Sequence, residues 1–246
     1  MKRRRQRNAD IPALDPREFG GRIAVLSPHL DDAVFSVGGT IARASRGGAR
    51  VSVLTMFAGD PQSSAPAGDW DRLAGFVTAG EAATARRCED RKACSLLSAT
   101  PVWQPFLDEQ YADDSDDGAL AYVLEEALRT ADTLLVPGYP LSHPDHVRLV
   151  RLVLAAGLFR GRIGLYAEQP YTLWEGRAGV LESLRDLVPE TLSWRGTRIG
   201  YRDLALKVLA CRAYSSQLAC IAHRIVWPMS RYEMFSGDVV ALLDSA

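Results

Sequence analysis

Two short segments of the chain combine histidine with aspartate. Residues 28–32 read Pro-His-Leu-Asp-Asp and residues 143–146 read His-Pro-Asp-His, so they hold three of the four histidines and leave His223 apart. Imidazole nitrogens and carboxylate oxygens in this mixture suit Zn²⁺ with three protein ligands and an open position. They suit Fe²⁺ in a two-histidine-one-carboxylate triad almost equally well. The same aspartates also have a purely structural interpretation as helix N-caps.

Each of the two segments follows an apolar run that is typical of a buried strand. Strands are expected at residues 22–27, 51–57, 133–137 and 163–167. Helices are expected near residues 33–46, 78–98, 118–130, 145–159, 177–187 and 202–220. This alternation predicts parallel strands with helical crossovers. Ligands bind beyond the carboxyl ends of such strands, so both histidine segments are expected at one edge of the sheet.

The pattern favours a single α/β domain of Rossmann-like architecture, with a mostly parallel sheet and helices on both faces. No linker or internal repeat interrupts the chain after residue 20. We expect residues 1–19 to form a flexible basic tail. Residues 1–10 hold five basic groups and one acidic group, so the net charge of −1 conceals a body at −5. The basic residues of the tail are therefore weak evidence for a nucleic-acid partner, and none is expected.

Length and composition exclude several classes of protein. A chain of 246 residues buries a sufficient core without a structural metal or disulfides, so any metal is expected to serve chemistry. The four cysteines contain no Cys-x-x-Cys pair, and the longest apolar run is far shorter than the roughly 20 residues that span a bilayer. We expect reduced thiols, a cytoplasmic location and no membrane partner. The oligomeric state is left open.

The two segments resemble the paired motifs of the PIG-L family, also called LmbE-like zinc-dependent N-deacetylases. Those motifs are Pro/Ala-His-x-Asp-Asp after the first strand and His-x-Asp-His after a later one. Weaker similarity covers Arg87-x-x-Asp90 in the long helix and a Lys…Ser-Gln element from Lys207 to Gln217. The resemblance implies that residues 20–246 form a deacetylase domain.

The resemblance also implies roles for single residues. His29, Asp32 and His146 would bind Zn²⁺, with Fe²⁺ as the other candidate metal. Asp31 would act as the general base on a metal-bound water, whose pKa a catalytic zinc lowers to about 7. The remaining two assignments are His143 as a protonated imidazole near the substrate carbonyl and Asp145 as the acceptor that orients a metal-binding ring.

Some positions depart from the family pattern or concern the substrate. Ala33 replaces a Glu that many relatives carry, and Leu141 stands where some relatives have a Tyr. Candidate substrate-binding residues are Arg87, Asp108 and Trp70, of which the last two follow expected strand ends.

The favoured function is removal of an N-acetyl or other N-acyl group from an amino sugar or a related small metabolite. The first alternative is a deacylase for a non-sugar amide in a specialised biosynthetic pathway. A non-haem iron oxygenase and a non-catalytic sugar-binding module are less favoured. A dinucleotide site is disfavoured, because Gly-x-Gly-x-x-Gly is absent after the first strand. Gly38 and Gly39 are instead expected to allow close packing of the first helix on the sheet.

Overall fold

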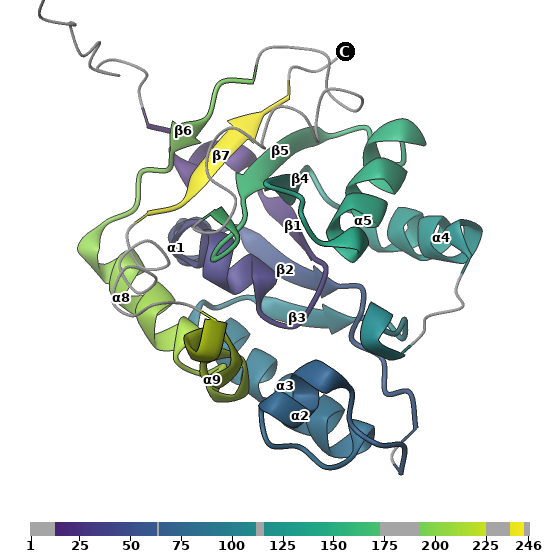
Figure 1. The fold of residues 1–246 in the computed structure, drawn as a ribbon. Helices are drawn as coiled ribbons and strands as arrows, with labels where there is room; N and C mark the ends of the chain where they lie inside the picture. Colours follow the sequence, from purple (N-terminus) through teal and green to yellow (C-terminus); the bar gives the residue numbers. More distant parts are fainter. Residues whose placement is uncertain (1–12, 63, 112–115, 173–191, 225–236, 244–246) are drawn as a thin grey trace, which may run out of the picture.

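The computed structural model describes residues 13–62, 64–111, 116–172, 192–224 and 237–243. Within these ranges a single seven-stranded sheet has the order β3-β2-β1-β4-β5-β7-β6 (Figure 1). The first five strands pair in parallel, whereas β7 pairs antiparallel with β5 and β6. The strands are β1 Arg22–Ser27, β2 Arg50–Thr55, β3 Thr100–Trp103, β4 Thr133–Tyr139, β5 Arg162–Ala167, β6 Arg195–Gly196 and β7 Val239–Leu242.

Helices cover both faces of the sheet, as the sequence predicts. In Figure 1, α1, α3 and α8 lie on one side of the sheet and α4 and α5 on the other. None of the helices within the described ranges is long and apolar enough to cross a membrane. The helices are α1 Asp32–Arg46, α2 Asp69–Leu73, α3 Ala79–Leu96, α4 Asp117–Leu128, α5 Pro144–Ala155, α8 Tyr201–Cys211 and α9 Ser215–Arg224, with short 3-10 helices η1 Pro16–Phe19 and η2 Glu109–Tyr111.

The core divides into two layers because side chains alternate along each strand. In β1, Ile23 and Val25 join the cluster under α1 and α8, while Ala24 and Leu26 join the cluster under α4 and α5. A strand buried on both faces must be apolar at consecutive positions, which is the pattern that predicted these strands. The helices change sides between β1 and β4, so the sheet opens a crevice at the carboxyl ends of those two strands.

Three features of the fold differ from the expectation. The helix expected over 202–220 is two helices, because the chain breaks after α8 to insert Tyr214 into the core against Phe35. The strand expected before Asp108 was given no bounds; it is β3, a short, half-exposed edge strand that contains Pro101, a residue tolerated only at such edges. The antiparallel strands β6 and β7 were missed. The helix expected at 177–187 lies outside the described residues.

The expected boundary between tail and domain at residue 19 is too late. Leu14 and Phe19 are each only 1% exposed and belong to the core cluster under α1. Asp15 caps η1 by accepting from the backbone N–H of Arg17, and Leu14 forms a β-bridge with Thr197. The folded part of the chain therefore includes residues 14–19, because two large apolar side chains in this segment are buried in the core.

Candidate metal centre and active site

The turn after β1 is closed by hydrogen bonds from its own side chains. The Ser27 hydroxyl donates to the carbonyl of His29 at 2.7 Å and accepts from the N–H of Ala33 at 3.0 Å. The N–H of His29 donates to Oδ2 of Asp32 at 2.9 Å. His29 and Asp32 are buried and contact His146 of the second segment, and Ala33 supports the turn through its backbone N–H.

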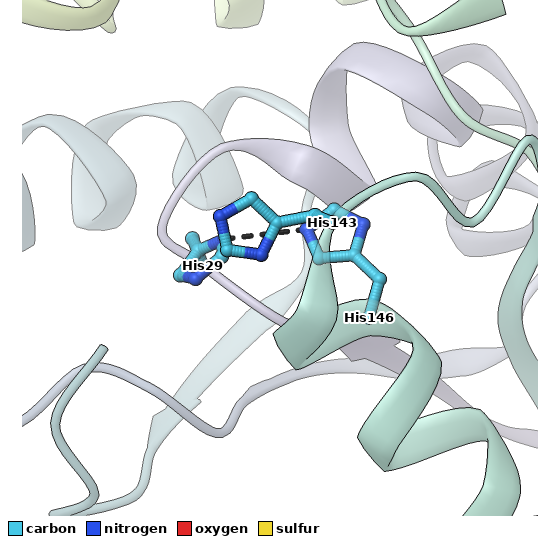
Figure 2. A group of neighbouring side chains, drawn as sticks. All are labelled: His29, His143 and His146. Carbon is cyan, nitrogen blue, oxygen red and sulfur yellow. Dashed lines mark hydrogen bonds between the residues drawn. The ribbon is translucent and has the colours of Figure 1, made fainter. Parts of the chain in front are cut away.

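The second histidine segment, residues 143–146, lies at the start of helix α5. Pro144 occupies the first helical position, where its fixed φ suits a helix start. His143 is the N-cap, and its Nδ1 accepts from the backbone N–H of Asp145 at 3.3 Å. His146 lies in the first turn of the helix and is fully buried. Figure 2 shows the three imidazoles of the two segments facing one another.

Three ligand-type atoms form a nearly equilateral triangle. Oδ2 of Asp32 lies 3.2 Å from Nδ1 of His29 and 3.2 Å from Nε2 of His146, and the two nitrogens are 3.3 Å apart. A tetrahedral ion with bonds of about 2.1 Å would hold its ligands about 3.4 Å apart. Two nitrogens and one carboxylate oxygen at this spacing fit a divalent cation such as Zn²⁺ or Fe²⁺.

Both buried imidazoles in the triangle have a carboxylate on the outer ring nitrogen. Nε2 of His29 lies 2.9 Å from Oδ2 of Asp145, and Nδ1 of His146 is hydrogen-bonded to Oε1 of Glu168. A carboxylate at the outer nitrogen keeps the proton there and leaves the inner nitrogen free to bind a cation. Asp145 thus lies where the resemblance implied. Glu168 was missed as the partner of His146, because nothing in the sequence pairs the two residues.

His143 is close to the triangle but is oriented differently. Its ring nitrogen lies within 4.8 Å of those of His29 and His146, so the three histidines could themselves hold a cation. However, Nδ1 of His143 is already an acceptor for a backbone N–H. Burial, together with the charges of His29 and His146, lowers the pKa of His143 to about 4. The lowered pKa and this hydrogen bond favour a neutral imidazole with its proton on Nε2 over the protonated ring that the resemblance implied.

Asp31 lies next to the triangle with an unusual backbone. Its φ is 144°, a region that L-residues rarely adopt, and its side chain makes no capping bond to α1. Burial and the neighbouring charge of Asp32 raise the pKa of Asp31 well above its ordinary value. Backbone strain of this kind costs about 1–3 kcal/mol and persists where the surrounding structure enforces it. The strain leaves Asp31 facing the cavity while Asp32 faces the histidines.

A cavity of about 510 Å³ opens over these residues. Of the expected substrate-binding residues, Trp70 and Asp108 line it. The indole N–H of Trp70 donates to Oε1 of Gln217 at 2.7 Å, which links α2 to α9. The other lining residues include the apolar side chains Phe35, Leu73, Pro170, Tyr171 and Ile221 and the polar side chains Asp69, Arg86, Glu109 and Gln110.

Arg87 does not line the cavity, contrary to the expectation. Its guanidinium donates to the carbonyl of Ala58 at 2.9 Å through Nε and lies over the ring of Trp103. The neighbouring Arg86 faces the cavity instead, is 7% exposed and pairs with Asp71 at 3.3 Å and Asp108 at 3.7 Å. Consecutive residues of a helix point about 100° apart, so a shift of one residue selects a different face of α3.

Several other positions singled out in the sequence have structural partners. Buried Asp90 accepts from the hydroxyl of Tyr214 at 2.6 Å and from the indole N–H of Trp103 at 2.7 Å. Leu141 is buried, and its N–H donates to Oε2 of Glu168 at 2.7 Å. Its side chain thus fills the core, whereas Tyr171 is the aromatic residue that packs edge-on against His146.

The sheet order and the histidine-carboxylate cluster define a doubly wound α/β protein with a cation-type site at its switch point. The family described as PIG-L: GlcNAc-PI de-N-acetylase matches residues 24–157, more than half of the chain. The protein therefore belongs to the PIG-L family. The matched range contains both histidine segments and all three atoms of the triangle.

Named relatives are similar over most of the chain. The 2'-N-acetylparomamine deacetylase of Streptomyces fradiae is 30% identical over 196 residues, which cover 69% of this chain and 65% of that protein. A triple mutant of a deacetylase of the teicoplanin biosynthetic pathway has a TM-score of 0.76 at 23% identity, covering 92% of this chain and 99% of its own. The deacetylase Dbv21, which acts on the pseudoaglycone of A40926, has a TM-score of 0.72 at 25% identity, with coverages of 92% and 98%.

Proposed function

We propose that this protein is a metal-dependent N-deacetylase that hydrolyses the N-acetyl or other N-acyl amide of an amino sugar in a natural product. The observation that carries the proposal is the triangle of His29, Asp32 and His146, with Asp31 beside it and a cavity above. The similarity to a protein named for removing the acetyl group of 2'-N-acetylparomamine supports the same reaction.

His29, Asp32 and His146 would hold the metal, with Asp145 and Glu168 fixing the two rings. A bound zinc ion would polarise the amide carbonyl and lower the pKa of water at the site to about 7. The donor set is compatible with Zn²⁺ and Fe²⁺, and we propose Zn²⁺ because two nitrogens and one oxygen with an open position are typical of catalytic zinc.

Asp31 would take the proton from the attacking water and return it to the departing amine nitrogen. Its raised pKa suits this exchange, because a base is most effective when its pKa approaches the working pH. The Nε2–H of neutral His143 would donate a hydrogen bond to the carbonyl oxygen as negative charge develops there. The products are a carboxylate and a free amine.

The lining of the cavity is consistent with a sugar. Trp70 and Tyr171 offer aromatic faces, and Asp108 with Arg86 offers a charged pair that can hydrogen-bond hydroxyl groups. A cavity of about 510 Å³ is within the range of small-molecule sites. The relatives named for paromamine and for a glycopeptide pseudoaglycone support an amino-sugar-containing natural product as the substrate.

A non-sugar amide is the second candidate, because Phe35, Leu73 and Ile221 contribute apolar side chains to the lining of the cavity. The iron oxygenase hypothesis loses support, since those enzymes use a jelly roll and this sheet is mainly parallel with helices on both faces. A non-catalytic sugar-binding module remains an outcome of the test below.

The test is acetate release from a panel of N-acetylated substrates, each with and without a chelator. The panel includes N-acetylglucosamine, its glycosides, acetylated aminoglycoside precursors, a glycopeptide pseudoaglycone and an N-acyl amino acid. The Asp31→Ala variant should bind zinc like the wild type and release no acetate. Full activity in this variant would rule out Asp31 as the base. Sugar binding without acetate release, at saturating zinc, would identify a binding module instead.

A further inference from the structure

Helix α1, which begins at Asp32, is interrupted in its second turn. Val37 has a φ of −128° and a ψ of 24°, so the helix consists of two segments joined at a kink. The first segment carries Asp32, and the second carries Arg46, which pairs with Asp203 of α8. Sharp kinks arise where a side chain inserts into the backbone hydrogen-bond ladder or where glycine weakens it, and both conditions occur here.

A buried ion pair contacts the helix backbone on both sides of the kink. In a continuous helix the N–H of Thr40 donates to the carbonyl of Ser36. Here the N–H of Thr40 donates to Oδ2 of Asp238 at 2.5 Å, while the carbonyl of Ser36 accepts from Nζ of Lys207 at 3.3 Å. Lys207 and Asp238 pair with each other at 2.6 Å, and both side chains are fully buried.

Two glycines make room for this arrangement. A Cβ at Gly38 would lie 3.0 Å from Cγ of Lys207, and one at Gly39 would lie 2.7 Å from Cδ1 of Ile199 and 3.2 Å from Asp238. The glycines therefore allow close contact with α8 and with the residues that precede α8 and β7, and not with the sheet as we had expected. The ion pair thereby connects α1 to α8 and to the residue that precedes β7.

The first segment of α1 is linked to both sides of the metal centre. Asp32 is one turn before the carbonyl that Lys207 holds. The hydroxyl of Ser36 accepts from the N–H of Gln169 at 3.0 Å, and Gln169 follows Glu168, the partner of His146. The orientation of this single turn thus sets Asp32 relative to the segment that holds His146.

A buried ion pair is a weak stabiliser, because removing two charges from water offsets most of their attraction. A regular helix without this ion pair would avoid that cost. We propose that Lys207 and Asp238 are positioning residues that fix the first turn of α1, and with it Asp32, in the geometry required for metal binding. This inference rests on the metal site of the proposed function.

The test compares two double variants of the whole chain. Lys207→Met with Asp238→Leu removes both charges at similar volume. The matched control is Arg46→Met with Asp203→Asn, which removes the other ion pair between α1 and α8, away from the kink, and retains the Asp203 acceptor for the N–H of Gly200. Zinc affinity is measured by chelator competition, and amide exchange of residues 33–36 is measured without metal.

We expect zinc affinity to fall at least tenfold, and exchange of residues 33–36 to accelerate, in the Lys207/Asp238 variant only. Wild-type affinity and exchange in a folded Lys207/Asp238 variant would overturn the inference, as would equal losses in the control. If that variant does not fold, Gly38→Ala decides, because its methyl group displaces Lys207 while favouring a helix. Absence of zinc binding by the wild type would refute the proposed function, whereas the exchange measurement would still decide this inference.

Discussion

Replacement of Glu168 by Gln should weaken metal binding without changing the size of the side chain. The carboxylate is 2% exposed and accepts from two donors, Nδ1 of His146 and the N–H of Leu141 at 2.7 Å. A glutamine has one acceptor oxygen and one amide nitrogen that can only donate. One of the two donors must therefore lose its partner in the variant.

The two possible outcomes have different signatures. If the amide oxygen stays with Leu141, His146 must move its proton to Nε2, the nitrogen that faces Asp32, and it can no longer bind a cation there. Loss of such an outer partner costs 10–100-fold in metal affinity, or about 1.4–2.8 kcal/mol. If the oxygen stays with His146, a buried N–H at Leu141 is left unpaired, which costs about 1–3 kcal/mol of folding stability.

The assay is chelator competition for zinc together with urea unfolding of the metal-free protein. Glu81→Gln is the control, because Glu81 accepts a backbone N–H at the start of α3, outside the metal centre. We expect Glu168→Gln to lose metal affinity, stability or both, within the ranges above. Wild-type values for both quantities would refute the role of Glu168 as the acceptor that fixes His146.

Three further predictions concern strain, the domain boundary and pH. The free energy of unfolding, measured in urea, should be about 1 kcal/mol larger for Asp31→Gly than for Asp31→Ala, because glycine tolerates the φ of 144°. A chain beginning at residue 20 should melt well below the full chain, since it lacks Leu14 and Phe19; Phe19→Ala alone should cost about 3 kcal/mol. The hydrogen bond from Arg22 lowers the pKa of Asp132, so Asp132→Asn should reduce stability at pH 7, with the difference disappearing as the pH falls below the ordinary aspartate range.

The site could be predicted best from sequence where an apolar strand is followed directly by histidine and aspartate residues. The runs before His29 and His143 are apolar at consecutive positions, so the strands could be placed, and the parallel topology then brings their carboxyl ends together. That reasoning predicted an edge of the sheet shared by His29, Asp32 and His146, and the structure brings their ligand atoms within 3.3 Å of one another.

Other features depended on information that local sequence does not contain. Glu168 is a single carboxylate after β5, and its contact with His146 arises only from the pairing of β4 with β5. Arg86 and Arg87 are chemically identical neighbours, so only the rotation of α3 about its axis decides which one faces the cavity. Lys207 was noted only as part of a Lys…Ser-Gln element, and its burial with Asp238, 31 residues away, could not be predicted from local sequence.

The connections that carry the metal-facing residues differ from those that carry part of the cavity lining. His29, Asp32 and His146 follow β1 and β4, whereas Trp70 and Leu73 lie between β2 and β3, and Asp108 lies after β3. Replacing the segments between β2 and β3 and after β3 would therefore leave the connections that carry His29, Asp32 and His146 unchanged. A designer could therefore change these lining residues to fit a different amide substrate without changing the three residues of the triangle.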